Sequence, residues 1–375
     1  MYKKFFMGIA AMAALTLVSC SSDDLNSLSD NSSKNEAISF DGYLGRSAVA
    51  VNGSRGSVVD IPALKSTELD KKGFGVFGYY NSSTTDHSVS EPSFDANLFN
   101  NERVTCPKDG VDWTYSPLKY WPAQGHIDFY AYAPYETGKT LNKKISATST
   151  TTTPTFNFTV ANNVADQTDL LWANAENKTK DNLSSEEKNK VKFKFGHALS
   201  RLGYTVKLNK DVSESEATIT LKRIALAGSA NEDTKAFYTK ATIDLSKTTD
   251  LWSDYATDRQ NFAWFSGSHL VTTGTTAIHP NENRAENEDY LFVIPQKFKN
   301  VTDHLYVIVE YAIEYKSGTA KPTVSYKVSQ QLSYDFEQGK AYTINLTIGL
   351  TPIEFNADVT GWDPITGTPI EIPLN

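Results

Sequence analysis

Hydrophobic and polar residues alternate with a period of two along much of this chain. In the segment HIDFYAYAP, residues 126–134, Ile127 and Phe129 fall on one face with two alanines, whereas Asp128 falls on the other with two tyrosines. Residues 342–350, YTINLTIGL, alternate in the same way. Successive side chains of a β-strand point to opposite faces, so this pattern predicts strands with one buried face.

A second kind of strand is predicted to be buried on both faces. Residues 305–315, LYVIVEYAIEY, are apolar on almost both faces, as a central strand of a sandwich can be. Aromatic residues make up 12% of the chain, and clusters of Gly, Pro, Asn and Asp separate the short strands. These features favour an all-β fold of β-sandwiches. The charged segment 173–190 has few large apolar residues and is the predicted boundary between domains 47–185 and 186–375.

The N-terminal residues have the pattern of an export signal. Two lysines precede an apolar stretch and the small Ser19, which predicts a signal peptide over residues 1–19. The stretch is shorter than the roughly 20 residues that a membrane-spanning helix needs. LVSC, residues 17–20, fits the bacterial lipobox, so we expect the thiol of Cys20 to be acylated and to become the new N-terminus. The alternative is an ordinary secretory signal with a chance cysteine.

The residues after Cys20 predict a tether. They are rich in Ser, Asp and Asn up to residue 36 and cannot form a core. Their Ser-Asp-Asp start resembles the signal that directs some lipoproteins of the Bacteroidota to the outer face of the outer membrane. Cys106 is the other cysteine, so an acylated Cys20 leaves no internal disulfide, and we expect Cys106 to be a small packed side chain or an inert loop thiol.

Composition and motifs argue against several classes of function. A net charge of −8 argues against nucleic acid as a partner. The six histidines are scattered, and no metal-binding or catalytic motif is present, so we predict no cofactor, no metal and no enzymatic activity. GFGVFG, residues 73–78, has dinucleotide-binding spacing, but it lies inside an alternating strand with no helix after it. We expect these glycines to make room for neighbouring rings or a bend, and the tryptophans to be core residues rather than a glycan platform.

Several segments together resemble one family. In chain order after the lipobox they are AISFDGYLGRSA, FGVFGYY, WTYSPLKYWPAQGHIDFYAYAP, FKFGHALSRLGYTVKL, LFVIPQ and GKAYTINLTIGLTPIEFNADVTGWD. They resemble, in the same order, segments of the fimbrillin family, the type V pilins of Bacteroidota. The resemblance runs from residue 15 to about residue 365, and PITGTPIEIPLN at the end follows no family pattern.

The resemblance implies a structural role. Such pilins are exported as lipoproteins and fold as two transthyretin-like β-sandwich domains in tandem. An arginine-specific protease removes the first strand, and the C-terminal strand of a neighbouring subunit replaces it. The implied partners are other fimbrial subunits, the outer membrane through the lipid, the protease, and a ligand on a host or bacterial surface.

The residues permit this mechanism at the N-terminal end. Residues 20–46 would be a tether and a removable strand, in which Ile38 and Phe40 alternate, followed less strictly by Tyr43 and Leu44. Arg46 and Arg55 both lie among small residues, in the kind of exposed loop that proteases cut. We prefer cleavage between Arg46 and Ser47, because it matches the family's arginine and frees the whole strand.

Two C-terminal segments could be the donated strand. Residues 353–362 alternate with Ile353, Phe355 and Val359, and residues 368–374 alternate with Ile370, Ile372 and Leu374. Residues 353–362 could instead be the last strand of their own domain. The predicted function is thus a fimbrial subunit or accessory pilin that supports adhesion. The alternatives are a monomeric outer-membrane lipoprotein that binds glycans or host ligands, and a surface hydrolase with clustered carboxylates.

Overall fold

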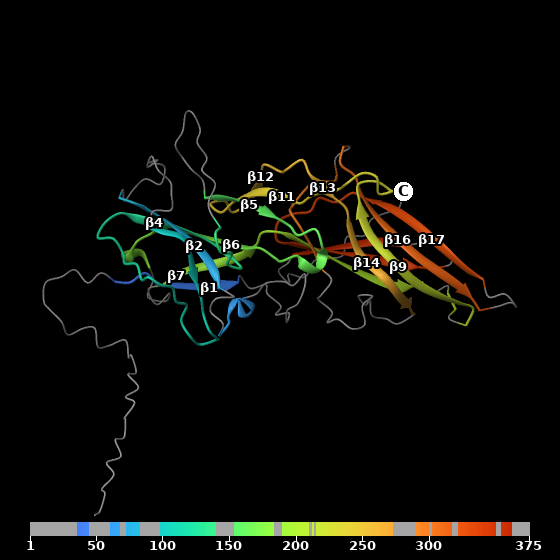
Figure 1. The fold of residues 1–375 in the computed structure, drawn as a ribbon, viewed down its shortest axis with the longest axis horizontal. Helices are drawn as coiled ribbons and strands as arrows, with labels where there is room; N and C mark the ends of the chain where they lie inside the picture. Colours follow the sequence, from blue (N-terminus) through green and yellow to red (C-terminus); the bar gives the residue numbers. More distant parts are fainter. Residues whose placement is uncertain are drawn as a thin grey trace, which may run out of the picture. The chain divides into compact units, whose positions relative to one another are not determined.

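The structure is nearly all β, as the alternating pattern predicts. It is a computed structural model (Figure 1), and its described residues belong to one compact unit, Glu36–Asn375. The described residues are 36–44, 61–67, 73–82, 98–139, 154–183, 190–209, 212–213, 215–272, 290–299, 302–316, 322–349 and 354–361.

Strands make up almost all of the regular structure, and the described helical elements are short 3₁₀ turns. The turns are η2 (Pro62–Leu64), η3 (Val164–Asp166) and η4 (Lys180–Asn182). The strands are β1 (Phe40–Leu44), β2 (Phe74–Asn81), β3 (Phe99–Val104), β4 (His126–Ala133), β5 (Thr155–Thr159), β6 (Leu171–Lys178), β7 (Val191–His197), β8 (Ser200–Leu208), β9 (Ala217–Ala227), β10 (Phe237–Tyr238), β11 (Lys240–Asp244), β12 (Trp252–Ser253), β13 (Arg259–Gln260), β14 (Phe262–Val271), β15 (Leu291–Val293), β16 (Leu305–Tyr315), β17 (Thr323–Leu332), β18 (Lys340–Ile348) and β19 (Glu354–Gly361).

The first sheet contains six strands in the order β1-β7-β6-β4-β2-β3. β1 forms one edge and pairs in parallel with β7, from Phe40 opposite Val191 to Leu44 opposite Phe195. The other neighbours in this sheet pair antiparallel. Parallel strands need a long crossover connection, and here residues 45–190 lie between the two strands. The first strand is therefore held in place by a segment that is distant in sequence.

β4 separates two hydrophobic clusters, because both of its faces are buried. Ile127 and Phe129 face the smaller cluster, whereas Tyr130 and Tyr132 belong to a main cluster built from β2, β4–β6, β8–β12 and β14–β18. We call the smaller one the first-strand cluster; its members are Ile38, Phe40, Leu64, Phe74, Val76, Phe99, Val104, Cys106, Trp113, Tyr115, Trp121, Ile127, Phe129, Ala131, Ala133, Leu171, Ala173, Ala175, Leu183, Val191, Phe193 and Phe195.

The prediction of one buried face for β4 is therefore wrong. Its tyrosines are buried because their hydroxyl groups find partners there: Tyr130 donates to Glu176 over 2.9 Å, and Tyr132 donates to Asn101 over 2.7 Å. Burial raises the pKa of Tyr132 above its usual value, so this hydroxyl stays protonated.

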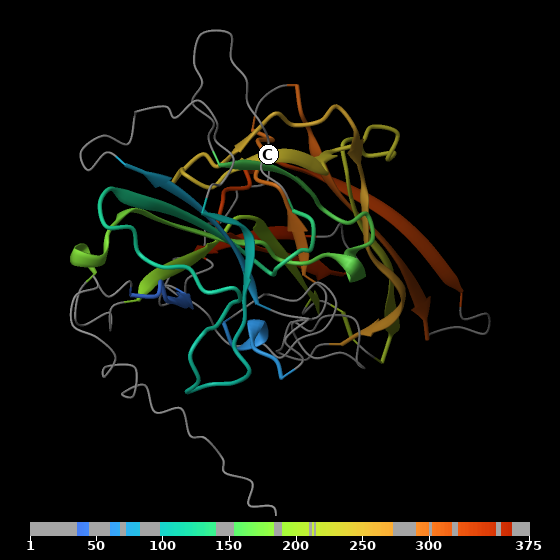
Figure 2. The ribbon, with the colours of Figure 1, turned by 60° about the vertical axis from the view of Figure 1, so that its left-hand side comes forward.

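Two four-stranded sheets make up most of the second half of the fold. Their strand orders are β14-β9-β16-β17 and β15-β8-β18-β19. β16 and β17 run antiparallel side by side over their whole length (Figure 2). Both strand predictions for this half are confirmed. β16 is buried along one face, and Ile308 and Ala312 are also buried on the other, whereas Tyr306 and Glu310 there are half-buried and Glu314 is exposed. The alternating apolar side chains of β18 all enter the main cluster.

One small sheet joins the two halves of the chain. β5 pairs antiparallel with β11, from Thr155 opposite Asp244 to Thr159 opposite Lys240, and β12 continues the sheet. The predicted boundary near residue 185 also falls between β6 and β7, which pair with each other. The division into domains 47–185 and 186–375 stays a prediction.

The structure confirms several predictions for single residues. Cys106 is buried and free, with its Sγ 3.1 Å from the carbonyl oxygen of Lys108. Every tryptophan among the described residues is buried: Trp113, Trp121, Trp172, Trp252 and Trp264. These side chains serve the core.

The GFGVFG segment forms the start of β2, and two of its glycines make room for rings. A Cβ atom at Gly75 would lie 2.3 Å from the ring of Tyr132, and one at Gly78 would lie 2.7 Å from the ring of Phe99. Both distances are too short for any real side chain. Gly73, just before β2, has a φ of 108°, and a Cβ atom there would lie 2.3 Å from the carbonyl oxygen of Val104, so the backbone rather than a ring requires this glycine. These local needs explain the three glycines without a nucleotide.

Candidate functional site

The segment around β1 is the part of the predicted assembly machinery that the structure describes best. Ile38 is 1% exposed and Phe40 is 0% exposed, whereas Tyr43 is 45% exposed. Among the described strands, β7 is its one neighbour in the sheet (Figure 1). β1 therefore has one apolar face against a core and, within the described part of the chain, one backbone edge without a partner strand in the sheet order.

Phe40 lies at the centre of an aromatic group. Its ring centroid is 5.3 Å from that of Phe99, 5.4 Å from Phe129 and 5.6 Å from Phe193. Tyr115 completes the group at 5.5 Å. Burial of a phenylalanine contributes about 1.5–3 kcal/mol, and edge-to-face pairs add to that. Phe40 alone therefore contributes a large part of the free energy that holds β1 against the rest of the protein.

Residues just before β1 are held by a second segment. The backbone N–H of Ile38 donates to the carbonyl of Lys119 over 2.8 Å, and that of Trp121 donates to Glu36 over 3.0 Å. The hydroxyl of Tyr115 donates to the carbonyl of Ile38 over 2.8 Å, and burial raises the pKa of Tyr115. These bonds fix the position of Ile38 above the first-strand cluster.

Gly42 gives this face a small position. It is buried, and a Cβ atom there would lie 3.1 Å from the ring of Phe195 and 3.5 Å from that of Phe74. The cluster therefore accepts two large side chains, at residues 38 and 40, and then a residue with almost no volume. Any strand that replaces β1 must match this sequence of sizes.

The predicted processing residues lie outside the described residues. This holds for Cys20, Arg46, Ser47 and Arg55. β1 itself ends at Leu44, so the segment that pairs with β7 ends before Arg46.

One of the two C-terminal candidates has a partner strand in its own chain. β19 pairs antiparallel with β18, with Phe355 opposite Leu346 and Val359 opposite Tyr342. The structure describes the backbone of this strand, not its side chains. Ile353, Ile370, Ile372 and Leu374 lie outside the described residues.

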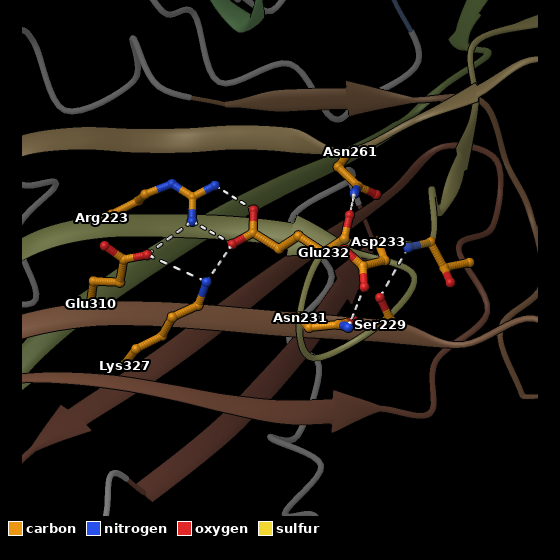
Figure 3. A network of polar contacts seen from close by, with 9 residues as sticks. Arg223, Ser229, Asn231, Glu232, Asp233, Asn261, Glu310 and Lys327 are labelled. Atoms are coloured by element: carbon orange, nitrogen blue, oxygen red, sulfur yellow. Dashed lines mark hydrogen bonds and ion pairs between the residues drawn. The ribbon is translucent and has the colours of Figure 1, made fainter.

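A charged ladder crosses the sheet β14-β9-β16-β17, as Figure 3 shows. Glu310 of β16 lies between Arg223 of β9 and Lys327 of β17 in the strand register. Glu232, in the loop after β9, accepts from Arg223 over 2.5 Å and 2.7 Å and from Lys327 over 2.9 Å. The backbone carbonyl of Glu232 also accepts from the side chain of Asn261 over 3.0 Å. No spacing pattern in the sequence indicates this ladder, because its members are far apart in the chain.

The described residues contain neither a cluster of metal-binding side chains nor a membrane-spanning helix. They contain no group of three or more His, Cys, Asp or Glu side chains that could hold a metal. Nor does this part of the chain contain a helix of the length and apolar character needed to cross a membrane.

Comparisons with known proteins agree with the resemblance found in the sequence. A family model described as fimbrillin-like matches residues 63–362. A fimbrial protein from Bacteroides vulgatus is similar in structure, with 23% identity over 88% of this chain and 100% of its own, at a TM-score of 0.60, which supports the fold. A candidate cell adhesion protein from Bacteroides uniformis is more distant, at 16% identity over 89% of this chain and 100% of its own, with a TM-score of 0.45. No curated protein matches the chain.

Proposed function

Because the chain belongs to the fimbrillin-like family, we propose that it is a structural subunit or accessory pilin of a cell-surface fimbria that supports adhesion. This is not a family of enzymes. The proposal includes export as a lipoprotein, with acylation of Cys20 and attachment to the outer membrane. The lipobox around Cys20 and the polar tether after it support this part of the proposal.

We further propose that the position of β1 is exchanged between subunits. The observation that carries this step is that residues 38–44, which end in the edge strand β1, cover an apolar cluster with two fully buried side chains, Ile38 and Phe40. Cleavage after Arg46 would release the strand together with the tether. An exposed cluster and a free backbone edge on β7 would then favour pairing with a strand from another subunit.

The donor strand in this proposal is residues 368–374. Residues 354–361 already pair with β18 in their own chain, which makes them the last strand of a sheet. Ile370, Ile372 and Leu374 alternate in the later segment. If Ile372 and Leu374 take the places of Ile38 and Phe40, no large side chain meets the place of Gly42, and burial of these two side chains contributes about 3–6 kcal/mol, at roughly 1.5–3 kcal/mol each. Proline at positions 369 and 373 is compatible with a strand at a sheet edge.

The test compares two arginine variants, Arg46→Ala and Arg55→Ala, expressed on cells that assemble the fimbria. We expect wild-type filament protein to begin at Ser47. Arg46→Ala should accumulate as full-length lipoprotein outside the filaments, because β1 keeps its own cluster covered. Arg55→Ala is the matched control and should assemble normally. N-terminal sequencing and filament yield measure both outcomes.

Normal filament growth by Arg46→Ala would reject strand exchange at this position. The monomeric glycan-binding alternative makes the opposite set of predictions. It requires that the surface protein begins at acylated Cys20 and retains β1. It also requires that the protein gives no series of oligomer bands on an unboiled detergent gel.

A further inference from the structure

A cavity of 740 Å³ is formed by the segments that follow β11, β15 and β17 in the chain. This volume lies within the range of small-molecule sites, about 300–1,000 Å³. The buried rings of Trp252 and Phe336 line it, and Tyr255 lines it with 37% of its surface exposed. The cavity shares no residue with the first-strand cluster, so strand exchange does not account for it.

The walls of the cavity are held by hydrogen bonds within the protein. Gln296 and Phe336 exchange two backbone hydrogen bonds of 3.0 Å and 2.9 Å, which tie the segment after β15 to the segment after β17. The hydroxyl of Tyr255 donates to the carbonyl of Pro295 over 2.7 Å and joins a third segment to them. Burial and the carboxylate of Asp250 raise the pKa of Tyr255 to about 12, so this donor persists at neutral pH. A ligand would enter a site that needs little ordering.

The aromatic side chains leave one ring available for stacking. The guanidinium of Arg259 covers a face of Tyr238 at 3.9 Å from the ring centroid. The ring of Tyr255 is 5.2 Å from that of Tyr238 and tilted by 54°. Because Tyr255 is more than a third exposed, it is the ring in this cavity that a ligand can contact broadly.

One polar atom in the lining has no partner. The Oε1 atom of Gln338 is buried and accepts no hydrogen bond from any residue that the structure describes. A buried acceptor left in this state costs about 1–3 kcal/mol, so a donor that reaches it, from water or from a ligand in the cavity, would be stabilised there. Thr248, Thr249 and the carboxylate of Asp250 also line the cavity and can bond hydroxyl groups.

The charges of the lining select among ligand classes. The lining contains one lysine, Lys297, and four carboxylates, those of Asp250, Asp303, Asp335 and Glu337. An anionic ligand is disfavoured by this excess of negative charge. Two of the carboxylates are already used, because Asp303 accepts from Arg259 over 2.8 Å and Asp335 accepts from the backbone of Phe298 over 2.9 Å.

We propose that this cavity binds an uncharged saccharide unit, which stacks on Tyr255 and donates hydroxyl hydrogen bonds to Gln338 and Asp250. A neutral sugar ring has the two properties that the lining requires: a C–H face for an aromatic ring and several hydroxyl donors for acceptor oxygens. The proposal goes beyond the fimbrial role, since it does not depend on cleavage or strand exchange.

The test measures binding of neutral oligosaccharides of glucose, galactose, mannose and N-acetylglucosamine to the purified protein, first on an array and then by calorimetry. We expect at least one of them to bind. Tyr255→Ala should weaken that binding about tenfold, and Gln338→Leu by a similar factor. Tyr255→Phe, which keeps the ring, should lose no more than about threefold. Asp250→Asn tests the contribution of the negative charge to binding. It is compatible with the backbone, because residue 250 has a φ of 51° that asparagine also adopts.

Tyr326→Ala is the matched control. Tyr326 is also 37% exposed, but it lies on β17 outside the cavity, so its loss should leave saccharide binding unchanged. Thermal unfolding of each variant verifies that it folds. The proposal is overturned if none of the neutral oligosaccharides binds at millimolar concentration, or if Tyr255→Ala and Gln338→Leu both bind as wild type does. It is equally overturned if only sialylated or sulfated glycans, or only a lysine-rich peptide, bind in the same assays. Filament assembly by Tyr255→Ala should be normal, which separates this test from that of strand exchange.

Discussion

The carboxylate of Glu232 shows how a single residue can couple two strands that are not neighbours in the sheet. It binds cations from β9 and β17, and its backbone has a positive φ of 68°, which the surrounding hydrogen bonds maintain. Hydrogen bonds from Arg223 lower the pKa of this carboxyl to about 2, from an ordinary value of 4.5. The shift means that the folded state prefers the charged form.

Stability should therefore depend on pH through this residue. Because the folded-state pKa is lowered, the stabilisation is complete above pH 4.5 and is lost as the pH falls towards 2. The network is partly exposed, so we expect Glu232→Gln to lower the free energy of unfolding at pH 7 by only about 1 kcal/mol. Near pH 2 the variant and the wild type should unfold alike. Thermal unfolding followed by circular dichroism from pH 7 to pH 2 measures the difference.

Glu314→Gln is the control for this prediction. Glu314 is an exposed carboxylate on β16 that is not part of the ladder, so its replacement should have little effect at either pH. An equal difference between Glu232→Gln and wild type at pH 7 and at pH 2 would contradict the assigned role of the charge.

Single residues were predictable from the sequence where the reason is local. The glycines of β2 could be assigned to ring packing, because large aromatic residues surround them in the chain. The burial of Tyr132 could not be predicted, since its partner Asn101 comes from another strand. The charged ladder and the cavity could not be predicted for the same reason. Tyr255 and Gln338, for example, are far apart in the sequence and line one cavity only because of the fold. Chemistry assembled from distant segments leaves no spacing signal in one sequence.

At the scale of elements, the sequence predicted the alternating strands and the buried face of β1. It did not predict that β1 pairs in parallel with β7, because strand order depends on contacts between segments more than a hundred residues apart. The arrangement assigns β1 to the first-strand cluster alone. Its removal should therefore affect one hydrophobic cluster and leave the main cluster intact.

Two phenylalanines of the first-strand cluster should respond differently to cleavage at Arg46. Phe40 and Phe74 are both fully buried, but only Phe40 lies on β1. Phe40→Ala should destabilise the precursor by about 3–5 kcal/mol. After cleavage at Arg46 the variant should be as stable as processed wild-type protein, because residue 40 has then been removed. Denaturant unfolding before and after treatment with an arginine-specific protease gives both values.

Phe74→Ala should destabilise both forms, because β2 remains after cleavage. The comparison controls for a general effect of losing a ring from this cluster. If Phe40→Ala still destabilises the processed protein, β1 has stayed bound and the proposed release does not occur.

At the scale of the whole molecule, the exchange proposal predicts which peptide the processed protein accepts. A labelled peptide of residues 368–374 should bind to protein cleaved at Arg46 and should not bind to the uncleaved precursor, where β1 occupies the position. A peptide of residues 353–362 tests the alternative donor, and preferential binding of that peptide to the cleaved protein would reject residues 368–374 as the donated strand. Fluorescence anisotropy measures all four combinations.

A variant peptide with Ile370, Ile372 and Leu374 changed to serine is the control. It keeps the length and the prolines but loses the apolar side chains, so it should not bind. Equal binding of the precursor and the cleaved protein would contradict the exchange.

The parallel alignment of β1 with β7 has a mechanical consequence. A strand that is pulled along its own axis must break all of its backbone hydrogen bonds together, whereas a strand peeled from one end breaks them one at a time. Five residue pairs, from Phe40 with Val191 to Leu44 with Phe195, would share such a load. A substitute strand loaded along its own axis in this place would resist with all of its bonds at once, so the strength of the joint would grow with the length of the strand.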